Sequence, residues 1–375
     1  MSIFLLILGL ILFVGLVVVH EFGHYIAARR GGVEVEEFGI GFPPKAWGKT
    51  LKSGMLFTIN WLPLGGFVKL KGEHDSATAK GSFGAASLRT KVAVMVAGVG
   101  MNLLTAFVLL TALALLGMPK LLDNQFTIGS DTKVIKNQVL VGSVEDGSPA
   151  QKAGLQVRDR LIKLTHHDTV MPVLSADQLP NITKHAAGHR VTISVERAGK
   201  ELQLQTTLRS KAEVEASKKT DNPKGYLGVS PSEYTLRRST WSAPIVAAGF
   251  MKQLTVETLK GLGSALWNSA RGHGKEASSQ VSGPVGIFVI LKDGSLLGYQ
   301  FMLMIIAIIS LTLAIMNVLP IPALDGGRLF VTLLYRKVLR RPLSQDLEER
   351  IHGTGFAALM LLFVLITIVD IKRFF

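Results

Sequence analysis

Three residues near the amino terminus carry side chains that can bind a metal ion. His20, Glu21 and His24 form the pattern His-Glu-x-x-His at the end of an apolar run. On a helix, positions i and i+4 lie on one face, so both imidazoles can bind one zinc ion with Glu21 beside a bound water molecule. The alternative is a polar cluster satisfied by its own neighbours. Such groups are costly at the end of an apolar span unless they face a metal or a polar cavity.

A third ligand is needed, because catalytic zinc takes three protein ligands and leaves one position open. The best candidate is Asp325, which ends the run Asn317-Val318-Leu319-Pro320-Ile321-Pro322-Ala323-Leu324-Asp325-Gly326-Gly327. Pro320 and Pro322 cannot continue a regular helix, so the chain must unwind there. Backbone freed inside a membrane persists only where protein or water satisfies it. An ordinary Asp-Gly-Gly turn is the alternative for Asp325.

Composition indicates which elements must position these residues. Of the 375 residues, 48% are hydrophobic and only 18% are charged, and the apolar residues are grouped in blocks. The absence of cysteine excludes a disulfide framework, an iron–sulfur cluster and cysteine-bound zinc. The net charge of +14 fits a nucleic acid or an anionic membrane surface. The mean hydropathy of +0.36 favours the membrane, and no interleaving of basic and aromatic residues supports nucleic-acid binding.

Four apolar stretches are candidates for helices that cross a bilayer, which needs about 20 apolar residues. They are residues 1–19, 92–119, 294–324 and 353–369. A cleaved signal peptide is the alternative for the first, although no basic region precedes it and no small-x-small cleavage site follows it. For the fourth and shortest stretch, the alternative is a buried amphipathic helix or a helix at the membrane interface. The first and the third stretch end at the candidate metal ligands.

Basic residues orient these spans. Many lysines and arginines lie between the first and second spans, and five lie between the third and fourth (Arg328, Arg336, Lys337, Arg340 and Arg341). The positive-inside rule therefore places both loops in the cytoplasm. The amino terminus and the long segment between spans two and three then lie outside.

The two long motifs together resemble the site-2 protease family of intramembrane zinc metalloproteases, in particular the bacterial branch typified by the regulator of sigma-E protease. Shorter motifs occur in the family's order and extend the resemblance over most of the chain. They are Gly39-Ile40-Gly41-Phe42-Pro43, Pro63-Leu64-Gly65-Gly66-Phe67-Val68-Lys69, Ala97-Gly98-Val99-Gly100-Met101-Asn102 and Ser282-Gly283-Pro284-Val285-Gly286.

The resemblance implies zinc bound by His20, His24 and Asp325, with Glu21 as the catalytic carboxylate. Four further residues are then candidates for substrate binding: Asn317, Asn102, Gly65 and Gly66. Asn317 matches a position placed near the substrate strand, and Asn102 matches a position in the second span.

Residues 33–42 and 55–70 read as short strands, which the family implies form a β-hairpin dipping into the membrane from the cytoplasmic side. Gly65 and Gly66 would let a substrate backbone approach an edge strand, whereas an ordinary cytoplasmic hairpin is the alternative.

A further resemblance lies between the second and third spans. The run Gly147-Ser148-Pro149-Ala150, with Ala153-Gly154-Leu155 and Asp159-Arg160-Leu161 after it, resembles the PDZ domains of bacterial proteases. Such domains bind extended peptides by strand addition. Arg158 stands where a glycine often precedes the aspartate. A spacer or steric guard without a peptide ligand is the alternative.

The fold expected from these features is a polytopic α-helical membrane protein of about four transmembrane helices. A cytoplasmic-side, membrane-re-entrant β-hairpin region and an extracytoplasmic PDZ-like α+β domain complete it. The expected order is a first transmembrane helix with the zinc motif (1–30), the β region (31–91), a second transmembrane helix (92–119), a connector (120–137), the PDZ-like domain (138–210), a linker with amphipathic or interfacial helices (211–293), a third transmembrane helix with the zinc-ligand motif (294–327), a cytoplasmic loop (328–352) and a fourth transmembrane helix (353–372).

The function that follows is regulated intramembrane proteolysis by a zinc metalloendopeptidase of the cytoplasmic (inner) membrane. The expected substrates are single-span membrane proteins, such as anti-sigma factors or remnant signal peptides, already cut outside by another protease. Two alternatives come from other classes. One is a membrane-anchored PDZ scaffold or pseudoprotease without turnover. The other is a metal-ion transporter, but transporters often carry internal repeats and paired broken helices, and this chain shows one broken span and no repeat.

Overall fold

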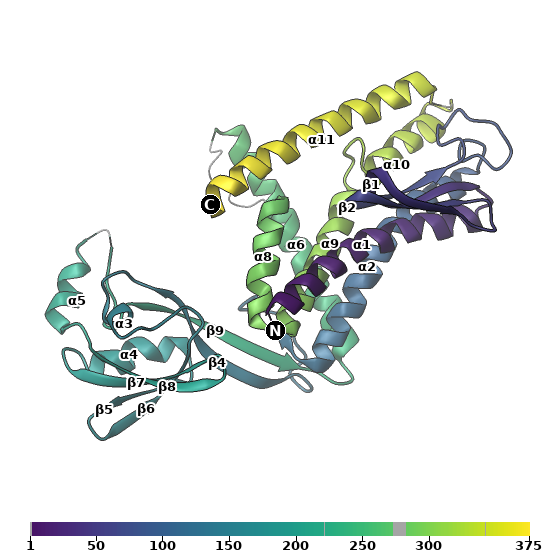
Figure 1. Cartoon of the computed structure of the whole chain (residues 1–375). Helices are drawn as coiled ribbons and strands as arrows, with labels where there is room; N and C mark the ends of the chain where they lie inside the picture. The colour runs from purple at the N-terminus through teal and green to yellow at the C-terminus, as the bar shows by residue number, and fades with distance from the viewer. Residues whose placement is uncertain (1, 221, 273–282, 342) are drawn as a thin grey trace. The chain divides into compact units, whose positions relative to one another are not determined.

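The computed structural model describes residues 2–220, 222–272, 283–341 and 343–375. The chain divides into two compact units (Figure 1). The first comprises Met1–Leu116, Gln125–Ile128 and Thr240–Phe375, and the second comprises Gly117–Asn124 and Gly129–Ser239. Ser282, which opens one of the short motifs, lies outside the described residues.

Helices make up most of the first unit. They are α1 (Ser2–Arg30), α2 (Leu88–Leu116), α6 (Ala243–Ala270), α8 (Pro284–Leu297), α9 (Tyr299–Val318), α10 (Asp325–Leu333), a π-helical turn (Leu334–Val338) and α11 (Gln345–Phe374). Among the described residues, four helices are long and apolar enough to cross a membrane: Ile3–Arg30, Leu88–Leu116, Tyr299–Val318 and Gln345–Phe374. Helix α2 packs against both α1 and α9 (Figure 1), which are the helices that carry or lead to the two metal-binding motifs.

The predicted third span is not one helix. Residues 294–297 belong to α8, and α9 begins at Tyr299 after Gly298, whose φ of +103° is open to glycine but strained for other residues. An uncharged run does not distinguish one helix from two, which is why the sequence missed this break. The predicted cytoplasmic loop 328–352 also differs, because α10, the π-helical turn and the start of α11 occupy most of it.

The β region of the first unit is a two-stranded antiparallel sheet of long, bent strands, β1 (Val35–Thr50) and β2 (Leu56–Leu70). The first half of β1 pairs with both halves of β2: Ile40 is opposite Gly66 on one side and Ile59 on the other. The second half of β1 pairs with the first half of β2. Residues 66–70 therefore form one edge of the sheet and residues 45–50 form the other.

A buried apolar cluster holds this sheet to the helices. Ala28 of α1, Phe38 of β1, Leu70 of β2 and Val94 of α2 all belong to it, and each is less than a tenth exposed. Burial of such side chains contributes about 1.5–3 kcal/mol each relative to exposure. The sheet is thereby fixed beside the carboxyl-terminal half of α1, where the His-Glu-x-x-His motif lies.

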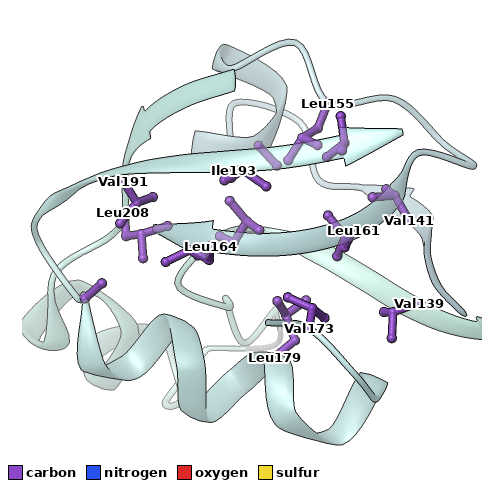
Figure 2. Packing of buried hydrophobic residues seen from close by; sticks show 14 residues of the cluster. Val139, Val141, Leu155, Leu161, Leu164, Val173, Leu179, Val191, Ile193 and Leu208 are labelled. Carbon is purple, nitrogen blue, oxygen red and sulfur yellow. The ribbon is translucent and has the colours of Figure 1, made fainter. Parts of the chain in front are cut away.

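The second unit is built on a seven-stranded sheet. Its strands are β3 (Met118–Pro119), β4 (Lys133–Val144), β5 (Arg160–His166), β6 (Thr169–Pro172), β7 (Arg190–Arg197), β8 (Lys200–Thr207) and β9 (Val229–Arg238), in the order β3-β9-β4-β5-β7-β8 with β6 paired to β5. Among the described residues, three short α-helices and a 3₁₀ turn (Ala176–Gln178) accompany it: α3 (Pro149–Lys152), α4 (Leu179–His185) and α5 (Lys211–Ser217). Figure 2 shows Leu164 and Ile193 from adjacent strands in one buried cluster with Leu179 of α4.

This unit extends beyond the predicted boundaries 138–210. Strand β9 comes from the segment assigned to a linker and pairs with β4 along its length, so the unit closes only at Ser239. Residues 211–217 form α5, whose Ser210 and Glu213 make a reciprocal capping box. Arg158 adopts a φ of +75°, the left-handed conformation that favours the glycine expected at this position.

Candidate metal centre

Three side chains from two distant parts of the chain converge on one point. The His20 and His24 Nε2 atoms, one helical turn apart on α1, are 3.2 Å from each other. The Asp325 Oδ2 atom is 3.1 Å from the His20 Nε2 and 3.3 Å from the His24 Nε2. The three atoms form a nearly equilateral triangle, and this is the group of possible metal-binding side chains found among the described residues.

The triangle has the dimensions of three corners of a tetrahedral zinc site. Zinc bonds of about 2.0–2.1 Å in tetrahedral geometry place ligand atoms about 3.4 Å apart. The ring Nδ1 of His24 donates to the Val94 carbonyl at 2.7 Å, so its Nε2 carries a lone pair and no proton in the neutral ring. Oδ2 of Asp325 is buried and makes no ordinary hydrogen bond to a described residue. When both rings turn an Nε2 lone pair towards the carboxylate, the three atoms repel one another unless a cation lies among them, so the residues fit a bound zinc ion.

The interruption of the helix between α9 and α10 determines the position of Asp325. Helix α9 ends at Val318, and Ala323 takes a φ of +78° before α10 begins at Asp325. The two glycines that follow allow the backbone to pack tightly. A Cβ on Gly326 would lie 2.2 Å from the Val318 carbonyl oxygen, and one on Gly327 would lie 2.0 Å from the Ile321 carbonyl oxygen. Both positions therefore exclude any side chain, and α10 folds directly back on the end of α9.

A buried ionic network holds α10 and its neighbours to the loop after β2. Asp75 accepts hydrogen bonds from Lys91 of α2, from the Arg336 Nε at 2.7 Å and from the Leu343 backbone N–H at 3.1 Å. Burial raises the pKa of Asp75, but the hydrogen bonds from Lys91 and Arg336 outweigh it and hold that pKa below its usual value. Removing one member of such a buried network costs about 3–5 kcal/mol, because it leaves an unpaired charge.

Three further contacts hold the helix that carries Asp325, and α11, to the same loop region. The Arg328 Nη2 of α10 donates to the Glu73 carbonyl at 2.5 Å, and its guanidinium group lies over the Phe83 ring. The Glu348 carboxylate of α11 accepts from the Asp75 backbone N–H at 2.8 Å. The sequence did not reveal this network, although Lys91 beside an apolar span was a visible signal that a partner carboxylate was needed.

Glu21 lies on α1 between the two histidines and is half-buried. The edge segment of β2 lies against it: a Cβ on Gly66 would be 3.3 Å from the Glu21 Cγ and 3.1 Å from the Gly39 carbonyl oxygen. Gly65 has a φ of +147°, and a Cβ there would overlap the Phe42 ring. The structure thus brings Gly66 next to Glu21, while Gly65 shapes the bend before it.

The two candidate asparagines lie in different surroundings. Asn317 is the penultimate residue of α9 and is half-buried, just before the break that leads to Asp325. Asn102 lies on α2 and is only 1% exposed, with its Nδ2 atom 3.2 Å from the His20 Nδ1. Gly98, which the sequence singled out only as part of a motif, lies one turn earlier on the same helix, and a Cβ there would meet both imidazoles.

Two cavities reach this region within the first unit. One, of about 940 Å³, is lined almost entirely by apolar side chains of α1, α8, α9 and α11, including Val17, Met316 and Phe363. The other, of about 450 Å³, is lined mostly by charged or polar residues and includes Asp325 itself. Its other charged or polar lining residues are Glu73, His74, Arg328, Glu348, Glu349 and His352. The second cavity therefore reaches a candidate metal ligand, and the first comes within one helical turn of Glu21 at Val17.

Comparison with known proteins agrees with the candidate zinc site. A family model described as Peptidase family M50 matches residues 8–362. A putative zinc metalloprotease of Clostridium acetobutylicum is 30% identical over 99% of this chain and 98% of its own length. A putative zinc metalloprotease of Fusobacterium nucleatum is 29% identical over 98% of this chain and 97% of its own. The zinc metalloprotease RasP of Shouchella clausii is 26% identical, covering 96% of this chain and 97% of that protein.

Proposed function

Because this chain belongs to Peptidase family M50, we propose that it is a multi-pass membrane zinc metalloendopeptidase whose zinc is held by His20, His24 and Asp325. The observation that carries the proposal is the triangle of acceptor atoms, 3.1–3.3 Å on each side, contributed by two elements about 300 residues apart in sequence. The names of the relatives, which are zinc metalloproteases, support the same conclusion.

The mechanism assigns one task to each side chain. When bound, zinc supplies a Lewis acid that polarises the scissile carbonyl and lowers the pKa of a water molecule to about 7. Glu21 accepts a proton from the attacking water and then gives it to the leaving amide nitrogen. The hydrogen bond from the His24 Nδ1 to the Val94 carbonyl holds that ring in the orientation that metal binding needs. Asp325 contributes the third ligand and a negative charge.

The substrate we propose is a transmembrane segment of a single-span membrane protein. The apolar cavity supports this, because Val17 lies one turn before Glu21 and Met316 lies next to Asn317. A helix that is cut must first unwind, which frees backbone groups that lipid cannot satisfy. The edge of β2 at Gly66 and the amide of Asn317 could satisfy them, and the polar cavity at Asp325 offers a route for water.

Anti-sigma factors and remnant signal peptides, trimmed outside by a first protease, fit this substrate class. Trimming would come first because a large external domain could not follow its helix into the cavity. The proposed arrangement places the centre near the cytoplasmic side of the inner membrane and residues 129–239 outside, in line with the basic loops around it. Because the chain has no cysteine, single cysteines introduced at Ser53 and Asp168 can check this, with only the second reacting with an impermeant maleimide.

The second unit supports a role in substrate selection. From Val229 to Glu233, β9 pairs with β4 on one side, and the described strands leave its other side open. We propose a PDZ-like domain that takes an extended peptide on this edge; a steric guard without a ligand is the alternative. Peptide addition should slow hydrogen exchange at the open β9 amides when a cleaved external fragment is present. Unchanged exchange together with faster cleavage of untrimmed substrates after loss of the domain would favour the guard.

The experiment that tests the function replaces Glu21. Glu21→Gln keeps the size of the side chain but removes the base, so we expect cleavage to fall by about 10²–10⁴-fold while zinc stays bound. Cleavage of a tagged single-span protein, co-expressed with each variant, gives the first readout, and metal analysis of the purified protein gives the second. The matched control is Glu36→Gln, an exposed glutamate of β1.

Three results would separate the candidates. Cleavage that persists in Glu21→Gln would remove Glu21 from the mechanism. A native chain that holds zinc but cleaves no membrane substrate would point to the membrane-anchored scaffold. Cleavage by the native chain that a chelator abolishes and added zinc restores is the result expected for the protease.

A further inference from the structure

One face of α2 lies directly behind the candidate metal ligands. Val94, Gly98 and Asn102 are spaced four residues apart, so they lie along a single stripe of the helix. Each contacts the imidazole pair or would do so if it had a side chain. We propose that this stripe sets the orientation of both imidazoles, and that Asn102 is a positioning residue that fixes the tautomer of His20. This inference rests on the proposed function.

The two rings need the same arrangement of protons. A histidine that binds zinc through Nε2 must carry its proton on Nδ1, and an acceptor at Nδ1 stabilises that tautomer. His24 has such an acceptor, because its Nδ1 donates to the Val94 carbonyl at 2.7 Å. His20 needs one too, and the polar group at its Nδ1 is the Asn102 side-chain amide, 3.2 Å away.

The chemistry of the amide decides which of its atoms faces His20. With the Nδ2 atom towards the ring, the amide donates, so the proton of a neutral His20 moves to Nε2 and blocks metal binding. With the two atoms exchanged, Oδ1 accepts the proton of Nδ1 and leaves the Nε2 lone pair free. A half-turn of the amide about its bond to Cβ exchanges these two atoms and leaves the shape of the side chain unchanged. Metal binding through Nε2 therefore requires the oxygen of Asn102 towards His20.

The residues around Asn102 do not fix the orientation of its side-chain amide, so the interaction with His20 determines it. Asn102 is 1% exposed, and its Oδ1 atom is buried without a hydrogen-bond partner among the described residues. No competing group therefore fixes the amide in either orientation. The backbone, by contrast, is held in place, because the Ser310 hydroxyl of α9 donates to the Asn102 carbonyl at 2.8 Å. A rigid backbone with a rotatable amide is suited to orienting one ring.

Burial also distinguishes this role from the one expected from sequence, in which Asn102 binds substrate. A side chain that is 1% exposed and faces the back of His20 reaches the metal side of the site only through that ring. We therefore expect changes at Asn102 to alter zinc affinity, whereas a residue that holds the substrate backbone would alter KM alone.

The test compares Asn102→Leu with Asn102→Asp in the full-length protein. Leucine has a similar size but no acceptor, so we expect zinc affinity, measured by competition with a chromogenic chelator, to fall about 10–100-fold. Aspartate keeps an oxygen acceptor and cannot donate, so its zinc affinity should stay within about threefold of the native value. Thr105→Val, which removes a hydroxyl from the same helix, is the matched control and should leave affinity unchanged.

A second readout is independent of activity. Cobalt replaces zinc in such sites, and its visible absorption reports the ligands, so Asn102→Leu should change the spectrum while Asn102→Asp and Thr105→Val preserve its shape. Unchanged zinc affinity in Asn102→Leu with a raised KM would overturn the inference in favour of substrate binding. Equal loss in Asn102→Asp and Asn102→Leu would also overturn it, because an acceptor would then not be what matters. A native protein that binds no zinc would instead overturn the proposed function itself.

Discussion

Asp325→Ala is expected to lower zinc affinity by a few hundred-fold and to abolish cleavage of a membrane substrate. Binding of zinc in four-ligand protein sites is worth about 10–16 kcal/mol, or roughly 2.5–4 kcal/mol for each ligand. Asp325 also contributes the only negative charge within 3.3 Å of both Nε2 atoms, among the described residues. Its removal leaves two neutral imidazoles on one helix, which bind zinc weakly and leave two positions open.

The measurement is chelator competition on the purified protein, with cleavage assayed at saturating zinc. Asp346→Ala is the control, since Asp346 is exposed in the first turn of α11 and has the same charge. Thermal unfolding of the zinc-free forms should be similar for both variants. If Asp325→Ala binds zinc as tightly as the native chain, the carboxylate is not a ligand and the centre must be built differently.

Gly98→Ala should lower zinc affinity and cleavage about as much as Asp325→Ala, although glycine has no polar side chain. A Cβ at this position would lie 2.5 Å from the His24 Nε2 and 2.7 Å from the His20 Nε2, closer than non-bonded atoms approach. The backbone of α2 cannot retreat easily, because it packs closely against α1, α9 and α6. Both rings must therefore move, and we expect zinc affinity to fall at least 100-fold, with cleavage lost in parallel.

Gly100→Ala provides a matched control on the same helix. A Cβ at Gly100 meets nothing within 4 Å, and alanine is the better helix former by about 1 kcal/mol. This variant should bind zinc normally and unfold at the same or a slightly higher temperature. Equal zinc affinity in Gly98→Ala and Gly100→Ala would show that the rings can shift without loss, and the close contact at Gly98 would then have no functional meaning.

The candidate centre was largely visible in the sequence, because its chemistry depends on residue types at short spacings. His20 and His24 share a helix face by their separation alone, and the prolines before Asp325 mark a break in an apolar span. The structure brings these three side chains together. It also places Gly66 beside Glu21, which sequence could suggest only through family resemblance. The substrate roles of Asn317, Gly65 and Gly66 stay predictions.

The features that could not be predicted from the sequence depend on contacts between elements that are distant in the chain. Nothing in a helical pattern states which face of α2 meets α1, so the role of Gly98 could not be read from its neighbours. Similarly, Asp75 and Lys91 are separated by a loop, and only the fold shows that Arg336 joins them. Strand β9 follows a stretch of polar residues that looks like a linker, and only its pairing with β4 assigns it to the second unit.

The break between α9 and α10 has a consequence for biosynthesis. The two imidazoles belong to α1, whereas the carboxylate that completes the set is made only later, after α9 has been synthesised. A nascent chain in the translocon therefore lacks a working centre while other unfolded segments pass beside it. Peptide hydrolysis can begin only once the chain has been synthesised through Asp325, which comes after α1, α2 and α9 and before α11.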